Sequence, residues 1–416
     1  MGTHFWLLSL WNLVEHVDCG REQLSGMRIC SIITSFTTGG AETLVCNLSE
    51  LFGKAGHNFA VIALSDAAQL GNCAETEQRM MARVQAAGGQ ALSLALGHRR
   101  GLFAGAWALR RALRDLRPDV VHAHTARAAL MLSLIPRSAP LILTHHNSRL
   151  GFPRQLFKLF DRTVDTYVAI SEECTSQRRR DVRRPVEQII NGADSRSRVA
   201  EPRLAPAAEP IILAVGTSSD QKDYPTLIRA VRPLIALLTP HDKKVRVRIV
   251  GGGAILPQLR QLVEEEGVGD VVELLGVRSD VPQLMRAADL FVNSSRYEGL
   301  SVAMIEAMMS ALPIVATDVP GNRELVHPGT NGLLVPSGNP DRLAAAMASV
   351  LLDPAIYRAY SAAALARSRN LTIEACADAH LELYRRELSP PGSRPPPSRP
   401  TTPLDVAYRV SPTPPE

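Results

Sequence analysis

Two carboxylates eight positions apart, Glu298 and Glu306, are the residues of this chain whose surroundings point most directly to chemistry. Glu306 stands in the apolar run 304–308, and an ionised carboxylate in such surroundings needs a partner. Glu298 follows a Ser-rich, Gly-containing stretch that predicts a loop. Two acids placed in this way can accept hydrogen bonds from the hydroxyl groups of a sugar or a ribose. The alternative for Glu306 is a cap or a salt bridge to a neighbouring loop.

The elements around these acids form one strand–loop–helix–strand unit. Residues 290–292 are an apolar run typical of a buried parallel strand, apolar residues then recur at helical spacing over 302–311, and 313–317 predicts a second strand. The loop of such a βαβ unit lies at the carboxyl edge of the sheet, where open α/β folds bind ligands. The free N–H groups at the start of the helix are suited to a phosphate.

This stretch resembles the Glu-x7-Glu acidic pair of retaining glycosyltransferases of family 4, the group 1 glycosyl transferases. The match includes EGL at 298–300 before the helix, EAM at 306–308 inside it, PIVATD at 313–318 and Gly-x-x-Glu at 321–324. The resemblance extends over roughly residues 27–388 and is more specific in the second half. It implies an α/β protein of the GT-B fold, in which two Rossmann-like domains face each other across a cleft.

The resemblance implies separate roles for the two acids. Glu306 is expected to hold the ribose of a nucleotide, and Glu298 to face the hydroxyls of the transferred sugar. Backbone amides at the start of the helix, in a cavity with little water, would stabilise the charge that develops on a departing phosphate. The residues expected to bind the donor are Gly39, Gly40, Gly216, Lys222, Arg278, Glu298, Gly299, Leu300, Ser301 and Glu306.

Two further loops of the second half match the family. Gly216 ends the strand that begins at residue 210, and Lys222 occupies the position of the family's phosphate-binding lysine. Arg278 lies in a loop that follows the strand 271–275 and resembles the family's loop beside the nucleobase. We therefore expect Lys222 to take part in catalysis as the cation beside the diphosphate.

One position departs from the family. Thr217 stands where an arginine is usual, so one cation instead of two is expected at the diphosphate. Either another arginine, such as Arg296 or Arg323, substitutes for it, or turnover is weaker. The sequence contains no Asp-x-Asp, which the other major glycosyltransferase architecture uses to bind a metal diphosphate. We expect no metal and no cofactor.

The first half supplies a glycine pair and four histidines. Gly39 and Gly40 follow the first strand, permit close approach of the backbone, and resemble the family's GGAE-type loop near the donor phosphates; an ordinary βα turn is the alternative. The runs 119–124 and 141–147 predict two buried strands that each end in two histidines. His146 matches the family's active-site histidine and is expected to be catalytic, with metal binding by these histidines as the rival interpretation.

Composition limits the classes of function. A formal net charge of +5 over 416 residues does not require a nucleic acid, and no nucleic-acid-binding motif occurs. Clustered arginines at 99–100, 110–117 and 178–184 are either solvated helix faces or a surface attracted to an anionic membrane. Six scattered cysteines without Cys-x-x-Cys fit a reducing cytoplasm, and no apolar stretch has the length of a membrane span.

These observations predict a division of the chain and a function. The expected segments are an N-terminal extension at 1–26, an acceptor domain at 27–200, a nucleotide-sugar-binding domain at 209–370, a helix crossing back to the first domain at 371–388, and a disordered Pro-rich tail at 389–416. The expected function is transfer of a sugar from a nucleotide-diphosphate sugar to a glycan or lipid-linked acceptor, in the cytoplasm or at the inner face of the plasma membrane. A nucleotide-sugar 2-epimerase of the same fold and a catalytically weak nucleotide-sugar-binding protein are the alternatives.

Overall fold

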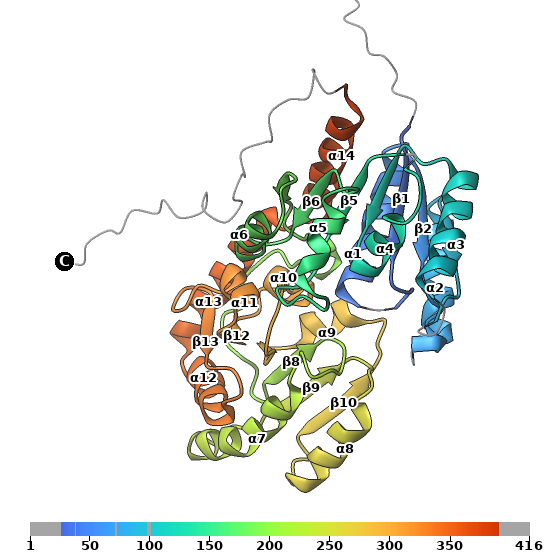
Figure 1. Ribbon diagram of the computed structural model, residues 1–416. Helices are drawn as coiled ribbons and strands as arrows, with labels where there is room; N and C mark the ends of the chain where they lie inside the picture. Colours follow the sequence, from blue (N-terminus) through green and yellow to red (C-terminus); the bar gives the residue numbers. More distant parts are fainter. Residues whose placement is uncertain (1–25, 38, 71–72, 98–100, 138, 391–416) are drawn as a thin grey trace, which may run out of the picture.

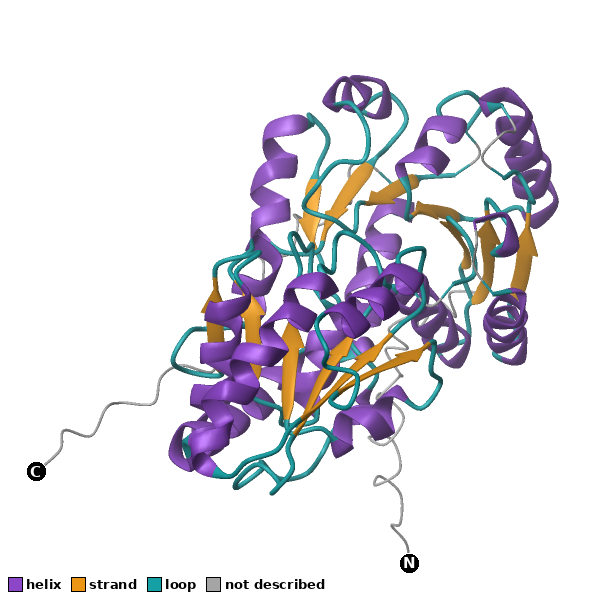
Figure 2. Cartoon of the chain, turned by 90° about the horizontal axis from the view of Figure 1, so that it is seen from below, coloured by secondary structure: helices purple, strands orange, loops and turns teal. Residues whose placement is uncertain are grey.

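The computed structural model describes residues 26–37, 39–70, 73–97, 101–137 and 139–390 (Figure 1). The extension expected at 1–26 and the tail expected at 389–416 lie almost entirely outside these residues. The described part of the chain forms two parallel β-sheets, each with helices packed on both faces (Figure 2). This arrangement confirms the predicted α/β fold of two Rossmann-like domains.

The first domain is built on a seven-stranded sheet in the order β3-β2-β1-β4-β5-β6-β7. All its neighbouring strands are parallel, and the central strands β4, β5 and β6 are buried along their whole length, as expected for strands covered on both faces. Its strands are β1 (Arg28–Ile33), β2 (Asn58–Ala63), β3 (Gln90–Ser93), β4 (Val120–Ala123), β5 (Leu141–Thr144), β6 (Thr166–Ala169) and β7 (Val186–Gln188). Its helices are α1 (Gly40–Lys54), α2 (Ala74–Ala86), α3 (Leu102–Leu116), α4 (Ala126–Leu132), α5 (Phe157–Phe160) and α6 (Glu172–Asp181).

The second domain is built on a six-stranded parallel sheet in the order β10-β9-β8-β11-β12-β13. The strand order reverses between β8 and β11, so their carboxyl ends border the crevice in which such sheets bind ligands. Its strands are β8 (Ile211–Val215), β9 (Arg246–Val250), β10 (Val272–Gly276), β11 (Leu290–Asn293), β12 (Ile314–Thr317) and β13 (Gly332–Val335). Its helices are α7 (Tyr224–Leu238), α8 (Leu256–Glu265), α9 (Val281–Ala287), α10 (Val302–Met309), α11 (Pro320–Leu325), α12 (Pro340–Leu352) and α13 (Pro354–Arg367).

Residues 152–161 contain little regular helix. A single 3₁₀ turn occupies Arg154–Leu156, and α5 adds only four residues to it. Pro153 precedes the turn in an extended conformation, so the helix cannot begin before it. The segment nevertheless packs aromatic rings into the core of the first domain: Phe152, Phe157 and Phe160 contact one another edge to face.

The chain passes between the domains twice, and the two passages bond to each other. The amide of Ala193 donates to the carbonyl of Leu371, and the amide of Ile373 donates to the carbonyl of Ala193, both at 3.0 Å. These bonds form an isolated parallel bridge between Ala193 and Thr372. Ser195–Ser197, a 3₁₀ turn that follows the first passage, packs against α9 and α10 of the second domain.

The second passage continues as α14 (Ile373–Leu388), which lies against the first domain. Tyr384 is fully buried and meets Phe52 of α1 edge to face, with ring centroids 5.9 Å apart. Farther along α14, Glu387 accepts a hydrogen bond from the Thr166 hydroxyl at 2.8 Å. Thus α14 completes the core of the domain that was built from the first half of the chain.

Close packing at the bridge makes Gly192 sensitive to substitution. A Cβ at this position would lie 2.1 Å from the Thr372 carbonyl oxygen, which is backbone and cannot move aside cheaply. We expect Gly192→Ala to lower the free energy of unfolding by about 1–3 kcal/mol, as overpacking does. Gly269→Ala is the matched control, because nothing lies within 4 Å of its Cβ position. Denaturant unfolding measures both, and equal stability of the two variants would contradict the packing at the bridge.

Candidate active site

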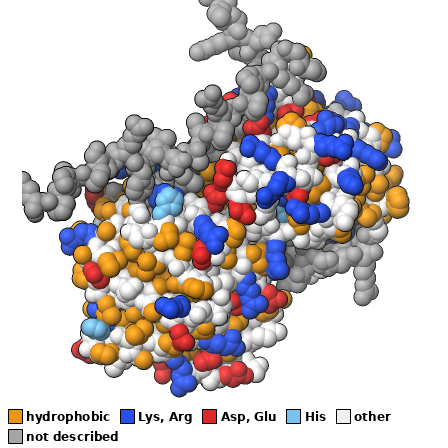
Figure 3. Space-filling view, turned by 60° about the vertical axis from the view of Figure 1, so that its left-hand side comes forward, with side chains coloured by type: hydrophobic (Ala, Val, Ile, Leu, Met, Phe, Trp, Pro, Cys, Tyr) orange, Lys and Arg blue, Asp and Glu red, His pale blue; other side chains and the backbone are white. Residues whose placement is uncertain are grey.

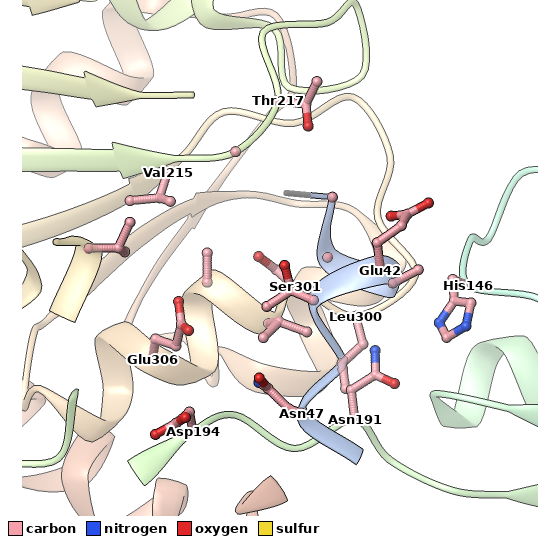
Figure 4. A pocket seen from close by; sticks show the side chains of 18 of the residues that line it. Glu42, Asn47, His146, Asn191, Asp194, Val215, Thr217, Leu300, Ser301 and Glu306 are labelled. Atoms are coloured by element: carbon pink, nitrogen blue, oxygen red, sulfur yellow. The ribbon is translucent and has the colours of Figure 1, made fainter. Parts of the chain in front are cut away.

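A cavity of about 610 Å³ lies between the two domains, at the carboxyl edges of their sheets. Glu306 and Asp194 lie toward one end of it, and Glu42 and His146 toward the other (Figure 4). The structure brings ten of the eleven predicted site residues together around this cavity. They are Gly39, Gly40, His146, Gly216, Lys222, Arg278, Glu298, Leu300, Ser301 and Glu306.

Gly299 is the predicted site residue that does not line the cavity. It faces the first domain: a Cβ at this position would lie 2.4 Å from the carbonyl oxygen of His146 and 2.9 Å from the Ile170 side chain. The glycine is therefore needed for a close approach between the two domains. The expected contact of Gly299 with the donor stays a prediction.

Glu298 is buried, 4% exposed, and its carboxylate is already bonded within the protein. It accepts hydrogen bonds from Lys222 Nζ at 2.5 Å and from Ser295 Oγ at 2.7 Å. The amides of Gln221 and Asn293 donate to it at 3.3 and 3.4 Å. This number of donors suits an ionised carboxylate that has lost its water. The prediction that Glu298 faces a sugar therefore requires a ligand to compete with these partners.

Lys222 reaches Glu298 by passing over a glycine. A Cβ at Gly216 would lie only 2.7 Å from Lys222 Cε, so Gly216 leaves room for the lysine stem. The lysine side chain is 16% exposed, and its charge is matched by Glu298. The predicted phosphate-binding cation thus lines the cavity as one half of an ion pair.

Glu306 contrasts with Glu298. It is half-buried on α10, and within the described part of the chain no group hydrogen-bonds its carboxylate. Burial, and to a lesser extent the nearby Asp194 carboxylate, raise the pKa of Glu306 to about 7, and Arg196 opposes the shift. A carboxyl group with this pKa, and with no hydrogen-bond partner among the described residues, is free to bond a ligand in the cavity.

The start of α10 presents backbone amides to the same cavity. Ser301 caps the helix, its hydroxyl accepting from the Met304 amide at 3.4 Å, and both Leu300 and Ser301 are buried. The cap leaves other amides of the first turn without helical partners. These groups and the helix dipole favour an anion at this end of the helix.

Glu42 is a site residue that the sequence analysis missed. It lies in the first turn of α1 and lines the cavity, and burial raises its pKa to about 7. A Cβ at Gly39 would lie 2.3 Å from Glu42 Oε2, so the first glycine of the pair makes room for this carboxyl group. The GGAE match contained the signal, since the acid follows the glycines directly.

The arginines suggested as substitutes at position 217 are engaged elsewhere. Thr217 lines the cavity, whereas Arg296 pairs with Asp223 at 3.2 Å and Arg323 with Asp318 at 2.6 Å, and neither arginine lines the cavity. The suggested substitution is therefore wrong. The sequence analysis missed the arginines that do line the cavity beside Arg278, which are Arg79, Arg83 and Arg196.

Histidines of the first domain form a buried cluster next to the cavity. His124 Nδ1 and His146 Nε2 are hydrogen-bonded at 2.9 Å, and the ring of His122 lies against that of His124 with centroids 4.0 Å apart. His122 is fixed by the Tyr384 hydroxyl and the Thr144 hydroxyl, each at 2.7 Å. This cluster brings α14 into contact with the residues behind His146.

The predicted grouping of four histidines is only partly correct. His145 turns away, bonding the Asn147 carbonyl and contacting Phe152, while His380 of α14 lies beside His122 in the cluster. Burial lowers the pKa of His146 to about 3 and holds the pKa values of His122 and His124 well below 6.5. His146 is therefore neutral at neutral pH. Among the described residues, no group of three or more His, Cys, Asp or Glu is placed to hold a metal ion.

His146 also lines a second cavity, of about 780 Å³, within the first domain. Its walls combine the histidine edge of the sheet with apolar side chains of α3, α4 and the segment 151–156. His146 therefore stands where a group held in the first domain could meet one held between the domains.

Comparisons with known proteins agree with this geometry. The model of the family "Glycosyltransferase Family 4" matches residues 38–196, and that of "Glycosyl transferases group 1" matches residues 209–353. The alpha-D-kanosaminyltransferase of Streptomyces kanamyceticus is 29% identical over 285 residues, which are 60% of this chain and 72% of the relative. The lipopolysaccharide core biosynthesis glycosyltransferase LpsD of Rhizobium meliloti (strain 1021) is 28% identical over 288 residues, 67% of this chain and 79% of the relative.

A likeness to solved structures shows the fold. The crystal structure of Anabaena Alr3699/HepE in complex with UDP-glucose is similar with a TM-score of 0.71 and 21% identity. The match covers 86% of this chain and 99% of that chain. This likeness, with the two facing sheets, confirms the predicted GT-B architecture.

The buried histidines predict sensitivity to acid. A histidine whose folded-state pKa is lowered binds fewer protons than in the unfolded chain, so its contribution to stability is lost as pH falls below about 6.5. We expect each such histidine to cost about 1.4 kcal/mol of unfolding free energy per pH unit in that range. Glu42 and Glu306, with raised pKa values, act in the opposite direction. His146→Gln should reduce the pH slope of stability, measured by denaturant unfolding between pH 7 and 5. An unchanged slope, or an NMR titration of His146 near pH 6.5, would contradict this account.

Proposed function

The chain belongs to the family 4, or group 1, glycosyltransferases of the GT-B fold, and from this we propose that it transfers a sugar from a nucleotide-diphosphate sugar to a glycan or lipid-linked acceptor, with retention of configuration. We propose a hexosyltransferase that needs no metal ion and serves polysaccharide or lipopolysaccharide assembly. The relative from Rhizobium meliloti, which carries lipopolysaccharide core biosynthesis in its name, supports the pathway class. The Anabaena protein, whose structure holds UDP-glucose, supports the donor class.

The observation that carries the proposal is the pairing of two acids with different surroundings on one βαβ unit. Glu306 has no partner among the described residues and points toward the end of the cavity that also holds Asp194, so it suits a ribose diol (Figure 4). Glu298 is bonded to Lys222 and lines the cavity as well. A donor placed with its ribose at Glu306 extends its diphosphate toward the start of α10.

The leaving group is stabilised by Lys222 and by the backbone amides around Leu300 and Ser301. An incoming diphosphate draws Lys222 partly away from Glu298, and the carboxylate freed of one donor can then accept hydrogen bonds from the sugar. Such preorganised donors typically contribute on the order of 10²–10³ in turnover each. Binding of the diphosphate by Lys222 and binding of the sugar by Glu298 are thus coupled in a single rearrangement.

The transfer step needs no base from the protein. The bond between the anomeric carbon and the phosphate oxygen breaks while the acceptor oxygen attacks from the same face, and the departing phosphate oxygen takes the acceptor's proton. Neutral His146 borders both cavities and can bond the sugar or the acceptor without adding charge. His124 fixes the orientation of its ring.

A second candidate is a nucleotide-sugar-binding protein with weak catalysis. It is favoured by Thr217, because the position usually held by arginine lacks a cation and Arg296 and Arg323 are paired away from the cavity. Nucleotide binding without transfer to any acceptor would distinguish it from the enzyme.

We place the protein in the cytoplasm, in contact with the inner face of the plasma membrane. None of the helices in the described part of the chain has the length and apolar character that crossing a membrane requires. Lys and Arg side chains gather over the upper right of the molecule in Figure 3, where the first domain lies. Residues 26–200 contain 23 Lys and Arg against 14 Asp and Glu, whereas the whole chain has 46 against 41. The excess of positive charge is thus concentrated in the half expected to bind the acceptor.

Substitution of Glu306 and of Glu298 should have different effects on binding and transfer. Glu306→Gln should weaken binding of a nucleoside diphosphate and of the intact donor by about 1.5–3 kcal/mol, the size of a charged hydrogen bond. The loss should be larger at pH 8.5 than at pH 6, since a pKa of about 7 leaves more of the wild-type carboxyl group ionised at high pH. Glu298→Gln should spare nucleoside diphosphate binding and depress transfer. Calorimetry with UDP and GDP, beside initial rates with donor, measures these effects.

Two outcomes would contradict these roles of Glu298 and Glu306. If Glu298→Gln abolished diphosphate binding while Glu306→Gln left it intact, the roles would be exchanged. If neither change affected binding or rate, the acids are structural. Glu264→Gln is a suitable control, because Glu264 is exposed on α8 and does not line the cavity.

Transfer should persist in excess chelator. The proposed stabilisation of the diphosphate comes from Lys222 and backbone amides, and the sequence contains no Asp-x-Asp. Initial rates with and without EDTA, each followed by added Mn²⁺, measure this directly. Complete loss in chelator with recovery on Mn²⁺ would overturn the proposed mechanism.

A further inference from the structure

Helix α3 carries two aromatic side chains that the fold does not use. Phe103 is 81% exposed and Trp107 is 65% exposed. Among the large hydrophobic residues of the described chain, only Leu204, at 66%, has a comparable exposure. The opposite side of α3 packs Ala106, Leu109 and Leu113 into the core of the first domain. The helix is therefore anchored by its inner face and leaves an aromatic pair, one turn apart, in solvent.

Arginines extend the same face of the helix. At 100° per residue, Arg110, Arg111 and Arg114 fall within about 100° of arc that also contains Phe103 and Trp107. All three arginines are exposed. Arg114 lies 3.3 Å from Asp115, an exposed pair that leaves most of its charge available to solvent partners.

This order of residues has a direction along the helix. The aromatic rings occupy the first two turns and the arginines the last two. Trp and Phe side chains of a surface helix insert at the boundary between lipid and water, and arginines are attracted by anionic head groups. A protein partner would need both an apolar pocket and acidic groups at matching spacing, whereas an anionic bilayer offers both everywhere.

The second cavity borders the start of the same helix. Gly101 and Leu102 of this region, Leu130 and Met131 of α4, and His146 all line it, whereas the exposed aromatic face lies outside its lining. The face and the cavity are therefore separate features of the first domain.

We propose that the face formed by Phe103, Trp107, Arg110, Arg111 and Arg114 docks the protein on an anionic lipid bilayer. Docking there holds the first domain, which the proposed function assigns to the acceptor, against the lipid surface. Only that assignment rests on the proposed function. The docking itself follows from the exposed side chains and their charge.

The test uses flotation of the full chain with vesicles of phosphatidylglycerol and phosphatidylcholine in equal parts, and with phosphatidylcholine alone. Wild type should bind the anionic vesicles, and binding should weaken with salt. Phe103→Ser with Trp107→Ser should lower the affinity at least tenfold. Replacing the three arginines by glutamine should lower it by about fivefold for each charge.

A matched control removes exposed apolar side chains elsewhere. Leu204→Ser with Leu237→Ser changes two residues that are 66% and 43% exposed in the second half of the chain, and it should bind vesicles as wild type does. Thermal unfolding checks that each variant remains folded. Wild-type affinity in both α3 variants, or failure of wild type to bind anionic vesicles, would overturn the proposal.

Two further readouts separate the other outcomes. If the aromatic face instead joins two copies of the chain, sedimentation would show a dimer that Trp107→Ser dissociates, without vesicle binding, and the proposal is wrong. Thermal stabilisation by UDP or GDP tests the donor site independently of lipid. Loss of nucleotide binding would refute the proposed function and leave the docking result standing, whereas vesicle binding unaffected by the α3 variants, with nucleotide binding intact, would refute the docking alone.

Discussion

The burial of one carboxylate, that of Glu298, constrains the candidate active site more than any other interaction. An ionised group removed from water must be matched by donors close by, because leaving it unpaired would cost several kcal/mol. The donors come from separate segments: Gln221 and Lys222 follow β8, while Asn293 ends β11 and Ser295 lies just beyond it. The carboxylate therefore ties together the two strands at which the order of the second sheet reverses. The position of Lys222 and the path of the loop into α10 both follow from it.

Titration has been shifted so that the cavity carries few unpaired charges at neutral pH. Burial raises the pKa of Glu42 and Glu306 toward neutrality and holds His146 in its neutral form, while Lys222 is matched by Glu298. A diphosphate entering such a site meets hydrogen-bond donors and cations that are mostly already paired. Lys222, Arg83, Arg196 and Arg278 each have a carboxylate partner. To bind, a ligand must replace the existing hydrogen-bond and ion-pair partners of these side chains. A ligand whose groups match the positions of those partners is therefore favoured over an anion of another shape.

The sequence predicted the parts of the site that follow from the periodicity of parallel strands. Glu298 and Glu306 could be placed because apolar runs fixed the βαβ unit around them, and His146 because it closely follows a buried strand. Residues that reach the site through tertiary packing could not be predicted from the sequence. His380 contacts His122 from far along the chain, and no local sequence pattern indicates this contact. Helix α2 also has a weak sequence signal, because the stretch 65–89 is polar and α2 buries few of its residues.

The double passage of the chain between the domains has a mechanical consequence. A single covalent connection lets two bodies both swing and twist, whereas two connections bonded side by side at Ala193 and Thr372 suppress twisting and leave one hinge axis near the bridge. Asp194 follows Ala193 directly and lines the cavity close to Glu306, so this end lies near the axis and changes little as the domains open (Figure 4). A rotation about this axis would displace His146, at the other end of the cavity, more than Asp194. A nucleotide could thus stay seated near the pivot while the domains part around the transferred sugar.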